Sequence, residues 1–144
     1  MELLEKLVND KFSAIENFDV ELPDNREPAP FGAGQFGKVI KYIPVKDNDQ
    51  LRMYWILPYC EDKQKSKPLT YLSHLFGHEG ENSLLSYLKS EGLALELGAG
   101  DDHSMNAISA FMIDIYLTKK GLAQYERVIE AVFQYAQRLR DAGP

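Results

Sequence analysis

Apolar residues recur at helical spacing near both ends of the chain. Residues 2–17 place apolar side chains on one side and charged ones on the other, which predicts an amphipathic helix. A second and longer pattern runs from Leu122 to Leu139. Thr118 is a suitable N-cap for this helix, and Gly143 is a suitable end. The second pattern predicts the longest helix of the chain.

Strand-forming patterns come in two pairs. Residues 38–45 and 50–58 are rich in β-branched and aromatic residues, and a stretch of turn composition separates them, so we expect a β-hairpin. Farther along, Leu93–Leu97 forms a short strand that runs into a glycine-rich turn at 98–101. Apolar and polar residues alternate over 107–117, which predicts a longer strand that pairs antiparallel with the short one.

Two helices are expected between these strand pairs. Pro68 suits the first turn of a helix that Ser66 or Lys67 caps. One face of this helix carries Leu69, Leu72, Leu75 and Phe76, and the opposite face carries Thr70, Ser73, His74, Gly77 and His78. Asn82 or Ser83 caps the next helix, which Gly92 stops and whose inward residues are Leu84, Leu85 and Leu88.

The order of these elements predicts the fold class. It reads α-β-β-α-α-β-β-α, and strand pairs that alternate with helix pairs favour an α+β fold. In such a fold the helices pack on one face of a mainly antiparallel sheet. Three prolines and three glycines between Asn17 and Gly37 mark a linker or a long surface loop after the first helix.

Composition narrows the classes of function. The chain has 144 residues, of which 44% are hydrophobic, enough for one domain with a real core. A net charge of −6 makes nucleic acid and membrane surfaces poor partners. No apolar run approaches the roughly 20 residues that span a bilayer, and no signal peptide is recognisable. The single cysteine, Cys60, cannot form an internal disulfide, so we expect an intracellular, cytoplasmic protein.

A glycine-rich motif at Gly32–Val39 matches the loop that covers ATP phosphates in protein kinases. We reject a kinase assignment, because the strand lysine, the H-R-D loop and the D-F-G triplet are missing from the sequence. A glycine-rich motif without its structural context is weak grounds for phosphate binding. A turn that leads into a strand is the preferred interpretation.

Two of the three histidines and a glutamate lie close together in the stretch 74–80. His74 and His78 are spaced one helical turn apart, and Glu79 could polarise a water, as in a zinc site. Such a site needs a third ligand, and spacing alone does not bring the candidates His103, Asp101 and Asp102 to this helix. The alternative is a polar helix end whose histidines are solvated. No G-x-S-x-G motif is present, and Cys60 has no histidine nearby in sequence.

Many separated blocks of sequence resemble one family. They include 71–80, 83–86, 88–90 and Gly92, then Asp114, 117–118, 121–122, 128–129, 133–135, 138–139 and 143–144, with 30–31 and 43–47 upstream. These blocks resemble the second domain of insulysin-type metallopeptidases, a branch of the pitrilysin (inverzincin) family. The resemblance covers nearly the whole chain, which makes it more specific than any single motif above.

The family's catalytic signature, H-x-x-E-H, occurs nowhere in this sequence. The resemblance therefore implies no catalytic residue and no metal in this chain, and places zinc in the parent enzyme. On the helix that corresponds to the zinc helix, Thr70 replaces the first ligand, Ser73 replaces the base, and only His74 remains. A serine cannot take a proton from water at neutral pH, so this chain alone should be inactive.

The resemblance also implies a site that holds the N-terminal end of a peptide substrate away from the zinc. In this sequence the site consists of His74, Gly77, His78 and Glu79 together with the edge strand Leu97, Gly98, Ala99, Gly100 and Asp101. An extended peptide can add to such an edge as another strand. Glu79, with Asp101, would meet the α-ammonium group. Ala99 stands where the family often has glycine, and its methyl group could shift the peptide.

The resemblance finally implies a domain organisation. Residues 1–20 correspond to the last helix of a preceding zinc-bearing domain, 21–36 to an interdomain linker, and 37–144 to the first part of the second, inactive domain. We then expect the remaining domains of the parent chain and a peptide as partners, and self-association through exposed strand edges. The alternative is a purely structural domain of a catalytically dead relative, such as a core or processing-peptidase-like subunit.

Overall fold

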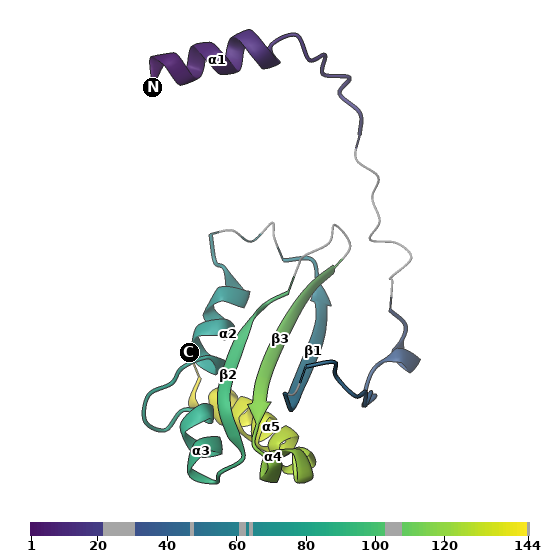
Figure 1. Cartoon of the computed structure of the whole chain (residues 1–144), viewed down its shortest axis with the longest axis vertical. Coiled ribbons are helices and arrows are strands. Elements are labelled where there is room, and N and C mark those ends of the chain that lie inside the picture. Colours follow the sequence, from purple (N-terminus) through teal and green to yellow (C-terminus); the bar gives the residue numbers. More distant parts are fainter. Residues whose placement is uncertain (22–30, 47, 61–62, 64, 103–107, 144) are drawn as a thin grey trace.

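Three antiparallel strands form the sheet of this domain. The computed structural model describes residues 1–21, 31–46, 48–60, 63, 65–102 and 108–143. The strands are β1 (Gln50–Pro58), β2 (Ala94–Asp101) and β3 (Ile108–Leu117), and they lie in the order β1-β3-β2. β3 is the central strand and pairs antiparallel with both neighbours. Figure 1 shows this sheet facing the viewer.

Side chains alternate across the sheet as the sequence pattern predicts. In β3, five residues on one face are buried: Ser109, Phe111, Ile113, Ile115 and Leu117. Met112 and Asp114, on the opposite face, are half-buried. The period of two places the buried set on one face of the sheet. That face carries the core, because Leu97 of β2 and the half-buried Met53 and Trp55 of β1 belong to the same cluster.

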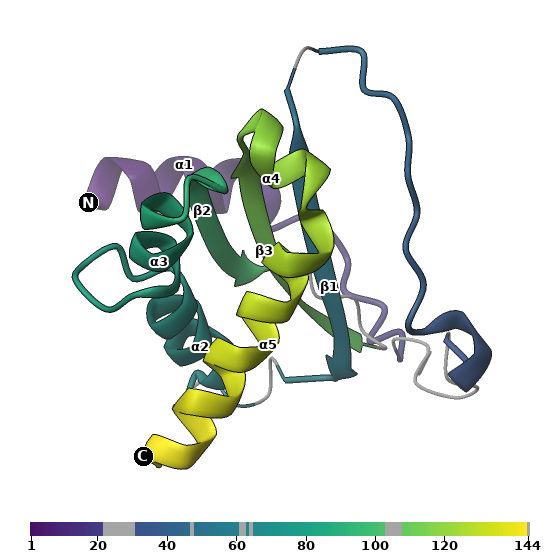
Figure 2. The same cartoon turned by 90° about the horizontal axis from the view of Figure 1, so that it is seen from below.

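Four helices follow or connect the strands. They are α2 (Pro68–Phe76), α3 (Leu84–Ser90), α4 (Lys119–Ala123) and α5 (Tyr125–Ala142). Figures 1 and 2 show α2, α3 and α5 on one side of the sheet, so the predicted α+β class is confirmed. Their contribution to the core comes mainly from leucines and valines, namely Leu84, Leu85, Leu88, Val128 and Val132. None of the helices among the described residues is long and apolar enough to cross a membrane.

The predicted boundaries of α3 are confirmed. Ser83 is the N-cap, and its Oγ accepts a hydrogen bond of 3.1 Å from the backbone N–H of Ser86. The three leucines expected to face inward are buried. Gly92 follows the helix with a φ of +65°, and the next N–H, that of Leu93, donates to the Leu88 carbonyl at 2.8 Å. A left-handed glycine therefore ends the helix and directs the chain into β2.

The first helix is shorter than predicted. α1 spans Glu2–Phe12, and the backbone N–H of Ser13 closes it on the Asn9 carbonyl. None of these eleven helical residues, all of them described, is buried. Figure 1 shows α1 standing apart from the sheet and its helices. With no surface to pack on, the amphipathic pattern has less to hold it beyond the third turn. Part of the predicted linker, residues 22–30, lies outside the described residues.

The predicted hairpin of 38–45 with 50–58 is wrong in its first strand. Within the described residues the sheet has three strands, and 38–45 is not one of them. The segment is extended but exposed, with Ile43 96% accessible. It runs instead toward the start of α5, where the Lys41 ammonium lies 4.2 Å from the centre of the Tyr125 ring. Strand propensity without an apolar face to bury did not suffice for pairing.

The glycine-rich motif and the last helix also differ from expectation. Residues Ala33–Gln35 form one 3₁₀ turn, η1, which leads into the exposed segment rather than into a strand. The single C-terminal helix is divided into α4 and α5, with Gln124 between them at φ −120° and ψ 34°. Thr118 does cap α4, because its Oγ1 accepts from the Gly121 N–H at 2.9 Å. The helical spacing of apolar residues continues across the break at Gln124, so the sequence pattern did not indicate it.

Candidate functional site

The edge strand β2 carries five of the residues that the sequence analysis assigned to a peptide site. It spans Ala94–Asp101, and in the described part of the chain only β3 pairs with it. The interpretation of residues 98–101 as a turn is therefore wrong, because the strand continues through both glycines. Both glycines are paired with residues of β3: Gly98 is opposite Asp114, and Gly100 is opposite Met112.

Part of the β2 backbone is accessible at its glycines. Leu97 is 7% exposed as a whole residue and belongs to the core, whereas Gly98 is exposed and Gly100 is half-buried. No described atom lies within 4 Å of a methyl group placed on Gly98 or Gly100. Ala99 lies between them and packs against the core on the helix side. Both glycines thus face open space on the side of the sheet that the helices leave uncovered.

The end of α2 lies against this strand. A methyl group placed on Gly77 would be 3.8 Å from the Ala99 nitrogen and 3.9 Å from the Ala99 Cβ. The structure therefore brings together the segment 74–79 and the strand 97–101, which are far apart in sequence. α2 ends at Phe76, so His78 and Glu79 lie in the following loop rather than on the helix. A side chain at position 77 would narrow the space beside β2.

The polar side chains of this segment are accessible. His74, His78 and Glu79 are all exposed. The two imidazole centres are 6.1 Å apart, so the histidines remain neighbours although only His74 is helical. A methyl group on Gly80 would lie 2.6 Å from His78 Nε2, which places the His78 ring directly over Gly80. Glycine at position 80 therefore leaves room for the His78 ring.

An aromatic cluster fixes the end of α2 to the core. Phe76 is buried, and its ring centre is 5.8 Å from that of Phe111 in β3 and 5.6 Å from that of Tyr135 in α5. The Tyr135 hydroxyl donates to the Leu75 carbonyl at 3.2 Å. Aromatic pairs at these separations add to the free energy gained from burial. The residue directly before Gly77 is thereby held from two sides.

The residues that correspond to the family's zinc helix do not fit a metal. The Ser73 hydroxyl donates to the Leu69 carbonyl at 2.7 Å and so is engaged within the helix. Thr70 offers a neutral hydroxyl, and His74 offers one imidazole, whereas a zinc site needs three or four nitrogen, sulfur or carboxylate ligands. Among the described residues, no group of three His, Cys, Asp or Glu side chains lies close enough to hold a metal ion. His103, a candidate third ligand, lies outside the described residues.

A polar network on the helix-free face escaped the sequence analysis. Arg52 of β1 donates from Nε and Nη2 to the two carboxylate oxygens of Asp114, at 2.6 and 2.8 Å. This hydrogen-bonded carboxylate raises the pKa of the Arg52 guanidinium above its ordinary value. Arg52 Nη1 also donates to the Tyr54 hydroxyl at 3.4 Å. The only signal for this network in the sequence was the alternation of inward and outward positions along β1, which places Arg52 and Tyr54 on the outward face.

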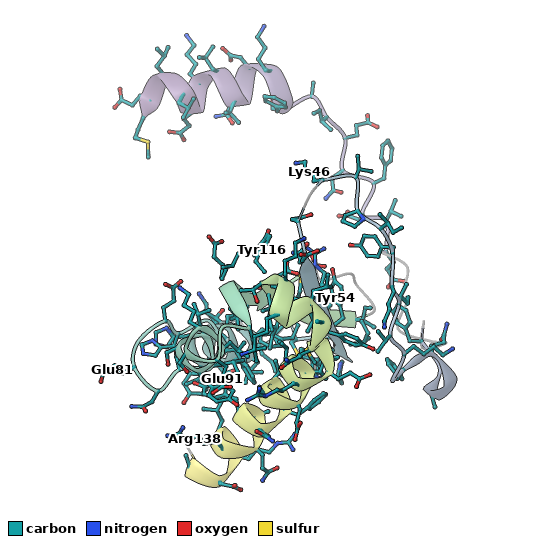
Figure 3. The ribbon with its side chains drawn as sticks, turned by 60° about the horizontal axis from the view of Figure 1, so that its bottom comes forward. Lys46, Tyr54, Glu81, Glu91, Tyr116 and Arg138 are labelled. Atoms are coloured by element: carbon teal, nitrogen blue, oxygen red, sulfur yellow. The ribbon has the colours of Figure 1, made fainter. Side chains whose placement is uncertain are left out.

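A separate hollow of about 590 Å³ lies between α3 and α5. Its rim includes Glu81 and Arg138, both labelled in Figure 3, and its walls carry serine, tyrosine and glutamine side chains. None of the residues assigned to the peptide site lines it. The candidate site is therefore the surface formed by β2 and the segment 74–80.

Comparison with known proteins identifies the fold. Residues 2–144 match the family model described as the Peptidase M16 inactive domain. A crystal structure of pitrilysin superposes with a TM-score of 0.81 at 25% sequence identity, over 100% of this chain and 15% of that one. The fold is therefore that of the domain described as inactive in this peptidase family.

Curated relatives extend the match to sequence. Insulin-degrading enzyme of Homo sapiens is 40% identical over 98% of this chain and 14% of its own length, and that of Drosophila melanogaster is 37% identical over the same shares. Nardilysin of Rattus norvegicus is 35% identical over 100% of this chain and 13% of its own length. The chain belongs to the M16 peptidase family, and the resemblance to insulysin-type enzymes is confirmed. It spans about one seventh of the length of these relatives.

Proposed function

We propose that this chain is a substrate-anchoring region of a zinc metallopeptidase that degrades peptides. It binds the N-terminal end of a peptide, which adds to β2 as a further strand. The position of β2 at the edge of the sheet carries the proposal, because among the described residues only β3 pairs with it. Its Gly98 is exposed, and its Ala99 lies beside Gly77 of the segment 74–79. Strand addition through backbone hydrogen bonds accepts peptides of varied sequence.

Charge at the site supports recognition of an α-ammonium group. Glu79 and Asp101 are exposed, and the stretch 74–80 contains no lysine or arginine. A carboxylate that accepts a hydrogen bond from an ammonium group forms a charge-assisted bond, which is stronger than a neutral one. His74 and His78 can add further polar contacts. Leu97 and the residues that follow it would contribute main-chain groups.

Replacement of Glu79 by glutamine tests this role. We expect the Glu79→Gln chain to bind a short peptide with a free N-terminus about 5- to 150-fold more weakly, a loss of about 1–3 kcal/mol for a charge-assisted bond. The same peptide with an acetylated N-terminus should lose little. Fluorescence anisotropy of the peptide, labelled at its carboxyl end, measures both affinities.

Glu81 supplies a matched control, because it is an exposed glutamate on the same loop but lines the hollow beside α5. Glu81→Gln should leave both affinities close to those of the unchanged chain. An equal loss for free and acetylated peptides in Glu79→Gln contradicts the anchoring role. Absence of peptide binding by the unchanged chain favours the alternative, a purely structural domain of a catalytically dead relative.

The rest of the proposal concerns the parent protein. We infer that zinc and the H-x-x-E-H motif belong to another domain of a longer chain, with residues 1–20 as the end of that domain and 21–36 as the linker. The exposed apolar residues of α1 then contact the remaining domains, or a second copy when those domains are missing. An intracellular location stays a prediction.

A further inference from the structure

Two residues without side chains lie together on the helix-free face of β2. Directly paired residues of neighbouring strands point to the same face of a sheet. Gly98 therefore shares a face with its partner Asp114, and Gly100 shares it with Met112. Asp114 and Met112 alternate with the buried residues of β3, so this is the face that the helices leave uncovered. We call the surface above Gly98 and Gly100 the glycine strip.

The neighbouring ion pair leaves the glycine strip open. Asp114 is paired with Gly98 on one side and with Arg52 on the other, because β3 lies between β2 and β1 (Figure 1). Both carboxylate oxygens of Asp114 accept hydrogen bonds from Arg52, at 2.6 and 2.8 Å. The carboxylate is therefore directed toward β1, and a methyl group on Gly98 would meet no described atom within 4 Å. Since the guanidinium also neutralises this carboxylate, Asp114 needs no cationic partner from a ligand.

A thioether borders the strip on β3. Met112 is half-buried, directly across from Gly100 and diagonally across from Gly98. A peptide that adds to the free edge of β2 places one residue opposite Gly98, with its side chain on this same face. Two strand spacings, about 10 Å, separate the peptide backbone from β3. Because Gly98 adds no side chain between them, a large side chain of the peptide can lie across β2 and meet Met112.

We propose that the glycine strip selects peptides that carry an aromatic residue opposite Gly98. The ring covers the glycine backbone, as aromatic neighbours of glycine do in sheets, and its far edge contacts the Met112 sulfur. A small side chain at this position leaves the strip exposed to water. The inference rests on the proposed function, because it names the class of peptide that the same site prefers.

The alternation of a strand gives the preference a period. Peptide residues on either side of the one opposite Gly98 point to the helix side of the sheet, toward Ala99 and the segment 74–79. They do not reach the glycine strip. An aromatic residue should therefore raise the affinity at alternate positions of the peptide, and not at the positions between them.

A scan of one phenylalanine along a short peptide with a free N-terminus tests the proposal. Each peptide carries phenylalanine at a different position, is otherwise identical to an alanine reference, and is labelled at its carboxyl end. We expect fluorescence anisotropy to show about two- to tenfold tighter binding than the reference at one position or at alternate positions, the range of aromatic pairs between strands. Lysine at the same position should give a smaller gain, since the Asp114 carboxylate is already paired.

Gly98→Val fills the glycine strip without a clash, because the space above Gly98 is open. The ratio of the two affinities, phenylalanine peptide to alanine reference, should fall to about one, while the affinity for the reference changes less than about twofold. Gly34→Val is the matched control: Gly34 lies in η1, where a methyl group also meets no described atom within 4 Å. It should leave the ratio unchanged. An unchanged denaturation midpoint shows that Gly98→Val is folded.

The methyl group of Met112 reports the contact directly by NMR. A ring placed over the strip should shift its signal when the phenylalanine peptide binds, whereas the alanine reference should not, and the Met53 methyl in the core should stay unchanged with both. Equal affinities for phenylalanine and alanine peptides at every position overturn the inference and leave the proposed function intact. So does an equal gain from lysine, or a preference that survives Gly98→Val. If the unchanged chain binds none of the peptides, the proposed function fails as well.

Discussion

Gly121→Ala should strongly destabilise the fold. A methyl group at this position would lie 1.9 Å from the Leu93 carbonyl oxygen and 2.9 Å from its carbon, and both are backbone atoms. Gly121 is buried in α4, where the chain packs against the start of β2. Neither backbone can move without disturbing the sheet, so we expect a loss of about 3 kcal/mol or more in the free energy of unfolding. Urea denaturation measures it.

This result is opposite to what local propensity predicts. Alanine in place of glycine inside a helix ordinarily stabilises by about 1 kcal/mol. Gly98→Ala is the matched control, because a methyl group there meets no described atom within 4 Å. It should leave the denaturation midpoint almost unchanged. An equal or higher midpoint for Gly121→Ala would show that α4 does not approach β2 this closely.

Phe76→Ala should both destabilise the chain and displace the anchoring segment. Phe76 is buried between Phe111 and Tyr135, and its removal leaves a cavity in the core. Phenylalanine-to-alanine changes in cores cost about 3–5 kcal/mol in the free energy of unfolding. Since Gly77 is the next residue, we also expect weaker peptide binding under conditions where the variant remains folded.

Tyr71 provides the comparison on the same helix. It is an aromatic residue of α2 that is 58% exposed, so Tyr71→Ala should cost less than about 1 kcal/mol. Thermal unfolding of the two variants gives the difference directly. Similar losses of stability for Phe76→Ala and Tyr71→Ala would contradict the placement of α2 described above.

Elements that carry their own start and stop signals could be predicted from the sequence. The serine cap, the inward leucines and the left-handed glycine of α3 are all local. The period of two in β3 likewise identified its buried residues, because a strand with one face in the core must alternate. These two elements agree with expectation almost residue for residue.

Features that depend on distant partners could not be predicted in this way. Residues 38–45 have the composition of a strand, yet pairing needs a neighbour that local pattern cannot supply. Gly98 and Gly100 have the composition of a turn, yet ladder bonds to β3 keep them in a strand. For the same reason, only the resemblance to a family indicated that 74–79 and 97–101 belong to one site.

The polar network on the helix-free face is the clearest case of this limit. Arg52 and Asp114 are separated in sequence by the helices α2 and α3 and the strand β2, and nothing near either residue indicates the other. Their contact follows from the strand order β1-β3-β2, which local periodicity does not determine.

Amide hydrogen exchange on β2, measured by NMR with and without a short free-N-terminus peptide, tests strand addition most directly. Alternate N–H groups of an edge strand point outward, so peptide binding should slow exchange at alternate residues within Leu97–Asp101. The outer edge of β1 should be unaffected. Binding that leaves Leu97–Asp101 unchanged, or that protects β1 instead, would contradict the account.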